Sequence, residues 1–246
     1  MNGTIKRAVL GAVCGCAAAS VLAAPDLDAV LLHESTSVSA DGVTRTASYR
    51  ERMVRRDGHV WVERVLPAAA DGAHAHRHAD ASPGKGGVRS VAADAHAGHK
   101  HFDFASASRH VTNDGKTVRI EYVNAAERTV VDVPPAEYET TGFDGSWDNA
   151  YFITPPSQLK KLDATAKPGS APGTRWYAQQ VATANANGVN RILWSDALQA
   201  PLAIEYRSAD GRIARKLTLT PATRVATAPW QRLMGYARKE YADFLD

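Results

Sequence analysis

Six of the nine histidines in the chain lie between positions 74 and 101. Together with one following carboxylate they form the candidate metal ligands: His74, His76, His78, His96, His99, His101 and Asp103. The first three alternate, so an extended backbone would project them from one face, where adjacent pairs could chelate an ion. His99, His101 and Asp103 would share a face if a strand began that early. Because neutral imidazole is the commonest protein ligand of divalent transition metals, we predict binding of Zn, Cu(II) or Ni.

The segment that carries most of these histidines, about residues 67–98, is rich in Ala, Gly, Asp and Ser. Such a composition offers little to bury, so we expect a long flexible His-rich loop inserted between structured parts. One alternative is a solvated loop that binds metal only as any polyhistidine does. Another is a metalloenzyme built on His99, His101 and Asp103.

Motifs of catalysis are otherwise missing from the sequence. It contains no Gly-x-Ser-x-Gly elbow, phosphate loop, dinucleotide fingerprint or His-Glu-x-x-His pair. We therefore predict no catalytic residues and no organic cofactor, and enzymatic activity is not the expected function.

The first 24 residues are typical of a secretory signal peptide. Lys6 and Arg7 precede an apolar run that ends in small residues, and we expect cleavage after Ala23 or Ala24. Both cysteines lie in this segment, so the mature chain has no thiol ligands; a lipid anchor at Cys16 is the alternative. We expect a periplasmic or secreted protein whose mature chain, residues 25–246, forms one domain.

Charge and hydropathy exclude two classes of partner. Loss of residues 1–24 removes two positive charges and no acid, so the formal net charge falls from +3 to +1. A nearly neutral chain makes no electrostatic case for binding nucleic acid. No window after the signal peptide is apolar enough for a transmembrane helix. The basic run from Arg50 to Arg56 is interpreted as the solvated face of a strand.

Alternating β-branched and aromatic residues predict a mainly β fold. A hairpin is expected over 43–66 with its turn at Asp57-Gly58, and another over 117–133. Phe102 and Phe104, two positions apart, indicate a half-buried strand between the two hairpins. Four strands separated by short turns then form an antiparallel meander over about 175–220. A short helix is expected at 155–162, a loop at 167–173, and an amphipathic C-terminal helix over Trp230–Phe244.

Part of this meander resembles the periplasmic lipoprotein-carrier (LolA-like) superfamily. The resemblance covers about residues 175–220 and rests on the stretch from Arg191 to Ile213, with Pro201-Leu-Ala-Ile204 between its strands and a turn at Asp210-Gly211. It implies an unclosed antiparallel β-barrel, a curved sheet covered by helices, whose members bind acyl chains or sense lipoproteins. The His-rich insert departs from that pattern.

Two principal hypotheses follow. The first is a secreted or periplasmic metal-binding protein that buffers, scavenges or delivers a transition metal through its His-rich loop. The second is a carrier or sensor whose concave sheet face holds an acyl chain or lipoprotein. The five tryptophans are spread one to an element, which fits either core packing or the lining of a lipid-sized cavity.

Overall fold

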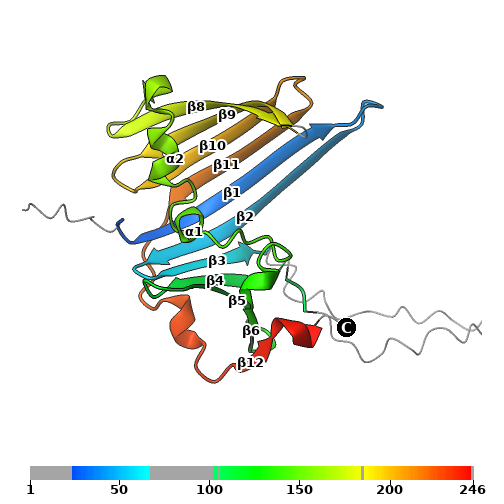
Figure 1. Ribbon diagram of the computed structural model, residues 1–246, viewed down its shortest axis with the longest axis vertical. Helices are drawn as coiled ribbons and strands as arrows, with labels where there is room; N and C mark the ends of the chain where they lie inside the picture. Colours follow the sequence, from blue (N-terminus) through cyan, green and yellow to red (C-terminus); the bar gives the residue numbers. More distant parts are fainter. Residues whose placement is uncertain (1–23, 67–101, 105, 184–185, 245–246) are drawn as a thin grey trace, which may run out of the picture.

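The computed structural model describes residues 24–66, 102–104, 106–183 and 186–244, and these form one curved sheet of twelve strands (Figure 1). Its spatial order is β12-β6-β5-β4-β3-β2-β1-β11-β10-β9-β8-β7. The two ends of the sheet do not pair with each other, so the expected unclosed, mainly β architecture is confirmed. All neighbouring strands are antiparallel except β12 and β6, which are parallel.

The strands follow the predicted hairpins and meander closely. Their bounds are β1 Leu27–Val38, β2 Thr44–Arg56, β3 His59–Val65, β4 Ser108–Asn113, β5 Val118–Asn124, β6 Thr129–Val133, β7 Lys167–Pro168, β8 Thr174–Thr183, β9 Ala186–Ser195, β10 Ala200–Ser208, β11 Ile213–Pro221 and β12 Ala237–Glu240. β1 is the strand that joins the two halves of the sheet, because it pairs with β2 on one side and with β11 on the other.

The turn between β2 and β3 shows why the sequence Asp57-Gly58 is needed there. Gly58 has a φ of +67°, and a Cβ at this position would lie 3.0 Å from the carbonyl oxygen of Asn113. Its own carbonyl accepts a hydrogen bond of 3.0 Å from the Asn113 backbone N–H. A side chain would therefore strain the turn and crowd the neighbouring strand.

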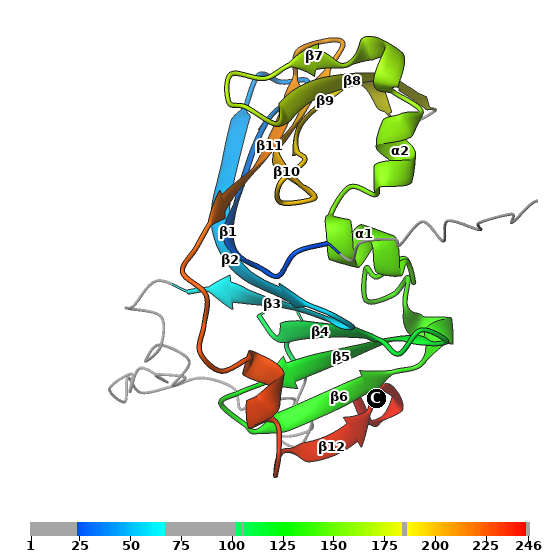
Figure 2. The same ribbon diagram turned by 90° about the vertical axis from the view of Figure 1, so that its left-hand side faces the viewer.

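The connection between β6 and β7 runs from one end of the sheet to the other across its concave face, called here the inner face (Figure 2). It carries two short α-helices and two 3₁₀ turns: α1 Trp147–Phe152, α2 Pro156–Lys160, η1 Pro135–Glu137 and η2 Asp163–Thr165. α1 begins where the Ser146 hydroxyl accepts a hydrogen bond from Asn149 N–H, and α2 begins at a proline, as predicted.

Arg55 of β2 fixes this connection to the sheet. Its side chain is fully buried, and its guanidinium donates to four carbonyls: Pro25 at 3.0 Å, Tyr151 at 3.0 Å, Leu198 at 2.6 Å and Gln199 at 3.1 Å. These carbonyls belong to the chain before β1, to α1 and to the β9–β10 turn. The interpretation of the basic run as a solvated strand face is therefore wrong for Arg55.

The C-terminal segment corrects another prediction, because residues 230–244 do not form a helix. They contain the 3₁₀ turn η3 Pro229–Arg232, strand β12 and the 3₁₀ turn η4 Tyr241–Phe244. Gly235, with a φ of +82°, interrupts any helical path. Trp230 and Leu233 pack on the outer face of the sheet, whereas Tyr241 and Phe244 reach the inner core. The helical spacing of apolar residues thus reflects contacts with two opposite faces.

Two smaller predictions also differ from the structure. Phe102 and Phe104 do not lie in a strand, since β4 begins only at Ser108; instead their rings pack together, with centroids 4.6 Å apart, beside Tyr122 and Phe244. The expected loop at 167–173 begins with the short edge strand β7. The predictions for residues 1–23 and for the His-rich segment lie outside the described residues.

Candidate functional site

Six of the seven predicted metal ligands, His74 through His101, lie outside the described residues. The seventh, Asp103, lies in a turn rather than on the expected strand edge, and its Oδ1 accepts a 3.3 Å hydrogen bond from Ser106 N–H. Within the described ranges, no group of three or more His, Cys, Asp or Glu side chains is arranged to hold a metal ion. A shared face for His99, His101 and Asp103 required a strand that includes them, and this condition is not met at Asp103, because β4 begins only at Ser108.

Two of the remaining histidines, His59 and His110, form a cluster on the outer face. His59 Nδ1 lies 3.1 Å from His110 Nε2. The Trp230 ring stacks on both imidazoles, with its centroid 4.7 Å from that of His59 and 5.5 Å from that of His110. His110 Nδ1 lies 3.2 Å from Glu121 Oε2. Trp230 comes from the segment that follows β11, so the cluster joins this segment to β3, β4 and β5.

Glu121 links the same cluster to the edge strand. Its Oε1 accepts a 2.8 Å hydrogen bond from Arg238 of β12, which also pairs with Asp132 of β6 at 3.1 Å. Burial by itself would raise the pKa of Glu121, but the hydrogen bonds from His110 and Arg238 outweigh it and hold the pKa at about 2. The carboxylate therefore stays ionised over most of the acid range.

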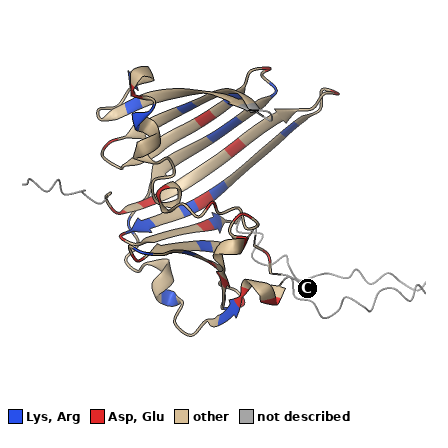
Figure 3. Cartoon of the chain, in the orientation of Figure 1, with Lys and Arg blue, Asp and Glu red and all other residues tan. Residues whose placement is uncertain are grey.

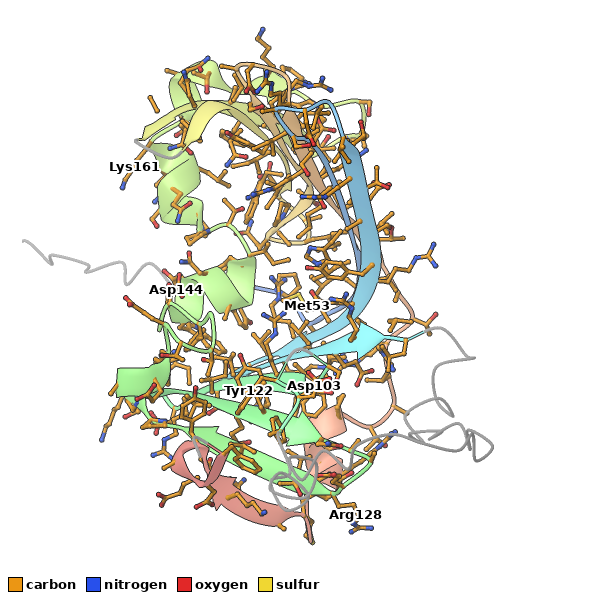
Figure 4. The ribbon with its side chains drawn as sticks, turned by 90° about the vertical axis from the view of Figure 1, so that its right-hand side faces the viewer. Met53, Asp103, Tyr122, Arg128, Asp144 and Lys161 are labelled. Carbon is orange, nitrogen blue, oxygen red and sulfur yellow. The ribbon has the colours of Figure 1, made fainter. Side chains whose placement is uncertain are left out.

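The inner face contains the cavities best suited to a ligand. One, of about 340 Å³, lies between the sheet and the segment 142–153 that includes α1. Figure 4 shows Met53 and Tyr122 extending from the sheet into this space, which the chain at Asp144 bounds on the other side. Its apolar lining comes from six strands and the α1 region: Leu31, Met53, Val60, Val62, Val111, Ile120, Phe143, Ala150, Ile153 and Leu217.

A second inner cavity, of about 350 Å³, adjoins the first. His33 and Leu217 line both, and the second extends along β10, β1 and β2 to Ile204, Tyr206 and Tyr49. Small-molecule sites commonly enclose about 300–1,000 Å³ of mostly apolar surface with a few polar groups. The two adjoining cavities, called here the inner groove, fall in that range.

The polar centre of the inner groove is Glu51. His33 Nε2 lies 2.9 Å from its Oε2, and Arg109 Nη2 lies 3.1 Å from its Oε1. Burial alone would raise the pKa of Glu51, but the contact with His33 and the positive charge of Arg109 outweigh it and lower the pKa below its usual value. The His33 ring also stacks on Tyr49 at 4.4 Å between centroids. Glu51 and its partners thus form a fixed ionic centre beside the apolar lining of the first cavity.

The opposite, outer face of β1 and β9–β11 presents a different chemistry. Charges of both signs alternate across these strands (Figure 3). Glu205 lies 3.6 Å from Arg191 and 3.9 Å from Lys216, on either side of it in the sheet. A hollow of about 700 Å³ here is larger than either inner cavity, but these charged side chains line it. Since they pair with one another, we place the candidate site on the inner face.

Sequence reasoning missed the inner groove residues His33, Glu51 and Arg109. The available signal was the alternation Tyr49-Glu51-Met53 in β2, which places all three on one face. That pattern does not reveal that β4 and β1 add Arg109 and His33 to the same carboxylate. Only the pairing of distant strands brings these groups together.

Comparison with known proteins adds a loose structural likeness. No protein-family model matches the chain, and no curated protein matches it by sequence. Among the described residues, no helix combines the length and apolarity needed to cross a bilayer.

Three solved structures illustrate this likeness. An uncharacterised conserved protein from Thermus thermophilus is 7% identical with a TM-score of 0.38, over 86% of this chain and 90% of that one. A putative outer membrane lipoprotein-sorting protein domain from Vibrio parahaemolyticus is 10% identical, with a TM-score of 0.30 over 83% and 88%. A LolA superfamily protein from Nitrosomonas europaea is 8% identical, with a TM-score of 0.27 over 84% and 90%. The Nitrosomonas europaea protein is a member of the superfamily that residues 175–220 resemble.

Proposed function

We propose that the protein binds a long apolar chain, such as the acyl chain of a lipid or lipoprotein, in its inner groove and acts as a carrier or sensor outside the cytoplasm. The observation that supports this proposal is the pair of adjoining cavities on the inner face, one of them between the sheet and the α1 region. The signal-peptide pattern of residues 1–24 supports the location.

The apolar lining sets the scale of the affinity. Each methylene removed from water contributes roughly 0.8 kcal/mol, so about ten buried methylenes contribute roughly 8 kcal/mol. The loss of translational and rotational freedom offsets part of this gain. We therefore expect dissociation constants in the micromolar range or weaker for single-chain ligands.

Leu217 offers a direct test because it lines both cavities. Leu217→Trp should fill the junction and weaken binding of an acyl ligand, followed by calorimetry with monolauroylglycerol, by at least about tenfold. Thr220→Trp is the matched control, since Thr220 is exposed on the same strand and points to the outer face. The control should bind as the unsubstituted protein does.

Two results would overturn the proposal. One is the absence of any binding of monolauroylglycerol or laurate by the unsubstituted mature chain. The other is equal binding by the Leu217→Trp variant when circular dichroism shows that it is folded. Lipid extraction of the purified protein, followed by mass spectrometry, gives an independent check for a bound acyl chain.

Transition-metal binding through the His-rich segment remains a second candidate function. It is supported by the six histidines between positions 74 and 101. The test is a calorimetric titration with Zn, Cu(II) and Ni of the mature, tag-free chain beside a variant lacking residues 71–101. Tight stoichiometric binding that the variant loses would support it. Binding no tighter than that of a free histidine peptide would overturn it.

A further inference from the structure

We propose that the ligand of the inner groove is an anionic amphipath, whose negatively charged head group binds Arg64 while its apolar chain occupies the 340 Å³ cavity beside α1. The inference rests on the proposed function, since it names the class of ligand for the same site. Neither Arg64 nor a head-group pocket is part of the apolar groove already described.

A small polar pocket adjoins the apolar cavity. It has a volume of about 160 Å³, less than half that of its neighbour, and lies over β2, β3, β4 and β5. The two spaces have four lining residues in common: Glu51, Val62, Arg109 and Tyr122. Arg64 lines the small pocket and not the larger cavity. A ligand with a chain in one space and a head in the other would pass between them.

The charges of this pocket favour an anion. Two guanidinium groups, Arg64 and Arg109, face the single carboxylate of Glu51. Arg109 and His33 both contact that carboxylate, at 3.1 and 2.9 Å, so its charge is already balanced. The pocket therefore has an excess of positive charge even with His33 neutral.

Within this pocket, Arg64 is the cation available to a ligand. Its Cζ lies 3.5 Å from the centroid of the Tyr49 ring, which orients the guanidinium without neutralising it. Across the described part of the chain, no carboxylate lies within ion-pair distance of Arg64. A planar guanidinium recognises carboxylate and phosphate oxygens in a bidentate manner. Both fatty-acid carboxylates and lipid phosphates would satisfy it.

The test compares anionic and neutral ligands with the same chain. Laurate and dodecyl phosphate should bind more tightly than uncharged monolauroylglycerol in calorimetric titrations of the mature chain. Arg64→Gln should weaken binding of the two anionic ligands by on the order of tenfold and leave the neutral ligand unchanged. Arg64→Lys keeps the charge and should retain most of the preference, which separates loss of charge from loss of folding.

Arg50→Gln is the matched control. Arg50 is an exposed residue of the same hairpin, and the substitution removes the same charge from the opposite face. It should change no affinity. A comparable loss in Arg50→Gln and Arg64→Gln would mean that net charge, and not a head-group pocket, attracts the anions, and would overturn the inference.

The outcomes also separate this inference from the proposed function. If neutral and anionic ligands bind equally and Arg64→Gln changes neither, the head-group pocket is refuted while the apolar groove stands. If no amphipath binds, both proposals fail. If inorganic phosphate alone binds as tightly as dodecyl phosphate, the pocket is a free-anion site and the amphipath is refuted. Tighter binding of laurate or of dodecyl phosphate identifies which head group is preferred.

Discussion

Replacing Arg55 with methionine should lower the free energy of unfolding by about 3–5 kcal/mol. The guanidinium is fully buried and donates to four carbonyls, at 2.6 to 3.1 Å. Its Cζ also lies 5.0 Å from the centroid of the Tyr151 ring. Methionine fits an aliphatic space of similar length but supplies no donor, so it leaves these carbonyls without the partner that Arg55 provides.

The magnitude follows from two opposing contributions. A hydrogen bond to a charged group contributes about 1.5–3 kcal/mol, so four such bonds represent a gross stabilisation of roughly 6–12 kcal/mol. Burying the charge costs several kcal/mol, and the substitution recovers that cost. Burial is also the main reason that the pKa of Arg55 is lowered from its usual value. The difference between the two contributions leaves the predicted loss.

Urea denaturation followed by circular dichroism measures this loss. Arg50→Met is the matched control, because Arg50 is exposed on the same strand, and its effect should stay within about 0.5 kcal/mol. A loss below about 1 kcal/mol in Arg55→Met, with an unchanged m-value, would refute the reasoning. It would mean that other contacts hold α1 and the β9–β10 turn to the sheet.

Three further predictions concern acid stability and processing. Burial, and secondly the nearby His110, lower the pKa of His59 below its usual 6.5. As the pH falls, this histidine is therefore protonated in the unfolded chain before it is protonated in the folded chain, and the free energy of unfolding should decrease below about pH 6.5. His59→Gln should flatten that fall in urea midpoints between pH 7.5 and 5; an unchanged slope would contradict it. The pKa of Glu121 is lowered from 4.5 to about 2, so its carboxylate contributes stability that is present above pH 4.5 and lost as the pH falls toward 2. Glu121→Gln should therefore remove this loss of stability between pH 4.5 and 2, as measured by urea midpoints. Finally, Ala24 is buried and its carbonyl accepts a 3.2 Å hydrogen bond from the Tyr151 hydroxyl. We therefore predict that cleavage of the signal-peptide pattern leaves Ala24 on the processed chain; intact-mass analysis that finds this chain beginning at residue 25 would contradict the prediction.

Local chemistry made most of the strands predictable. The turn at Asp57-Gly58 and the alternation of Val118, Ile120 and Tyr122 are typical of hairpins, and both hairpins are present. The four strands β8–β11 likewise follow short turns in the sequence. Alternation reports which residues share a face within one strand, and turn residues report where the strand ends, so neither needs information from distant parts of the chain.

The C-terminal segment shows where this local reasoning ends. The spacing of Trp230, Leu233, Tyr241 and Phe244 is helical, yet the first two pack on the outer face and the last two reach the inner core. Periodicity indicates that these residues are buried, but it does not say against which surface. That depends on where β6 lies when residues 237–240 pair with it.

The candidate site depends on the tertiary structure for the same reason. The sequence drew attention to the His-rich segment, because its spacing resembles a set of metal ligands. The inner groove and the polar pocket beside it instead combine His33 of β1, Glu51 of β2, Arg64 of β3 and Arg109 of β4 with the α1 region. Each is an ordinary strand residue when considered alone. Their proximity arises only because the sheet curves and a connection between its two ends passes over the concave face, and such long-range contacts leave no local pattern in the sequence.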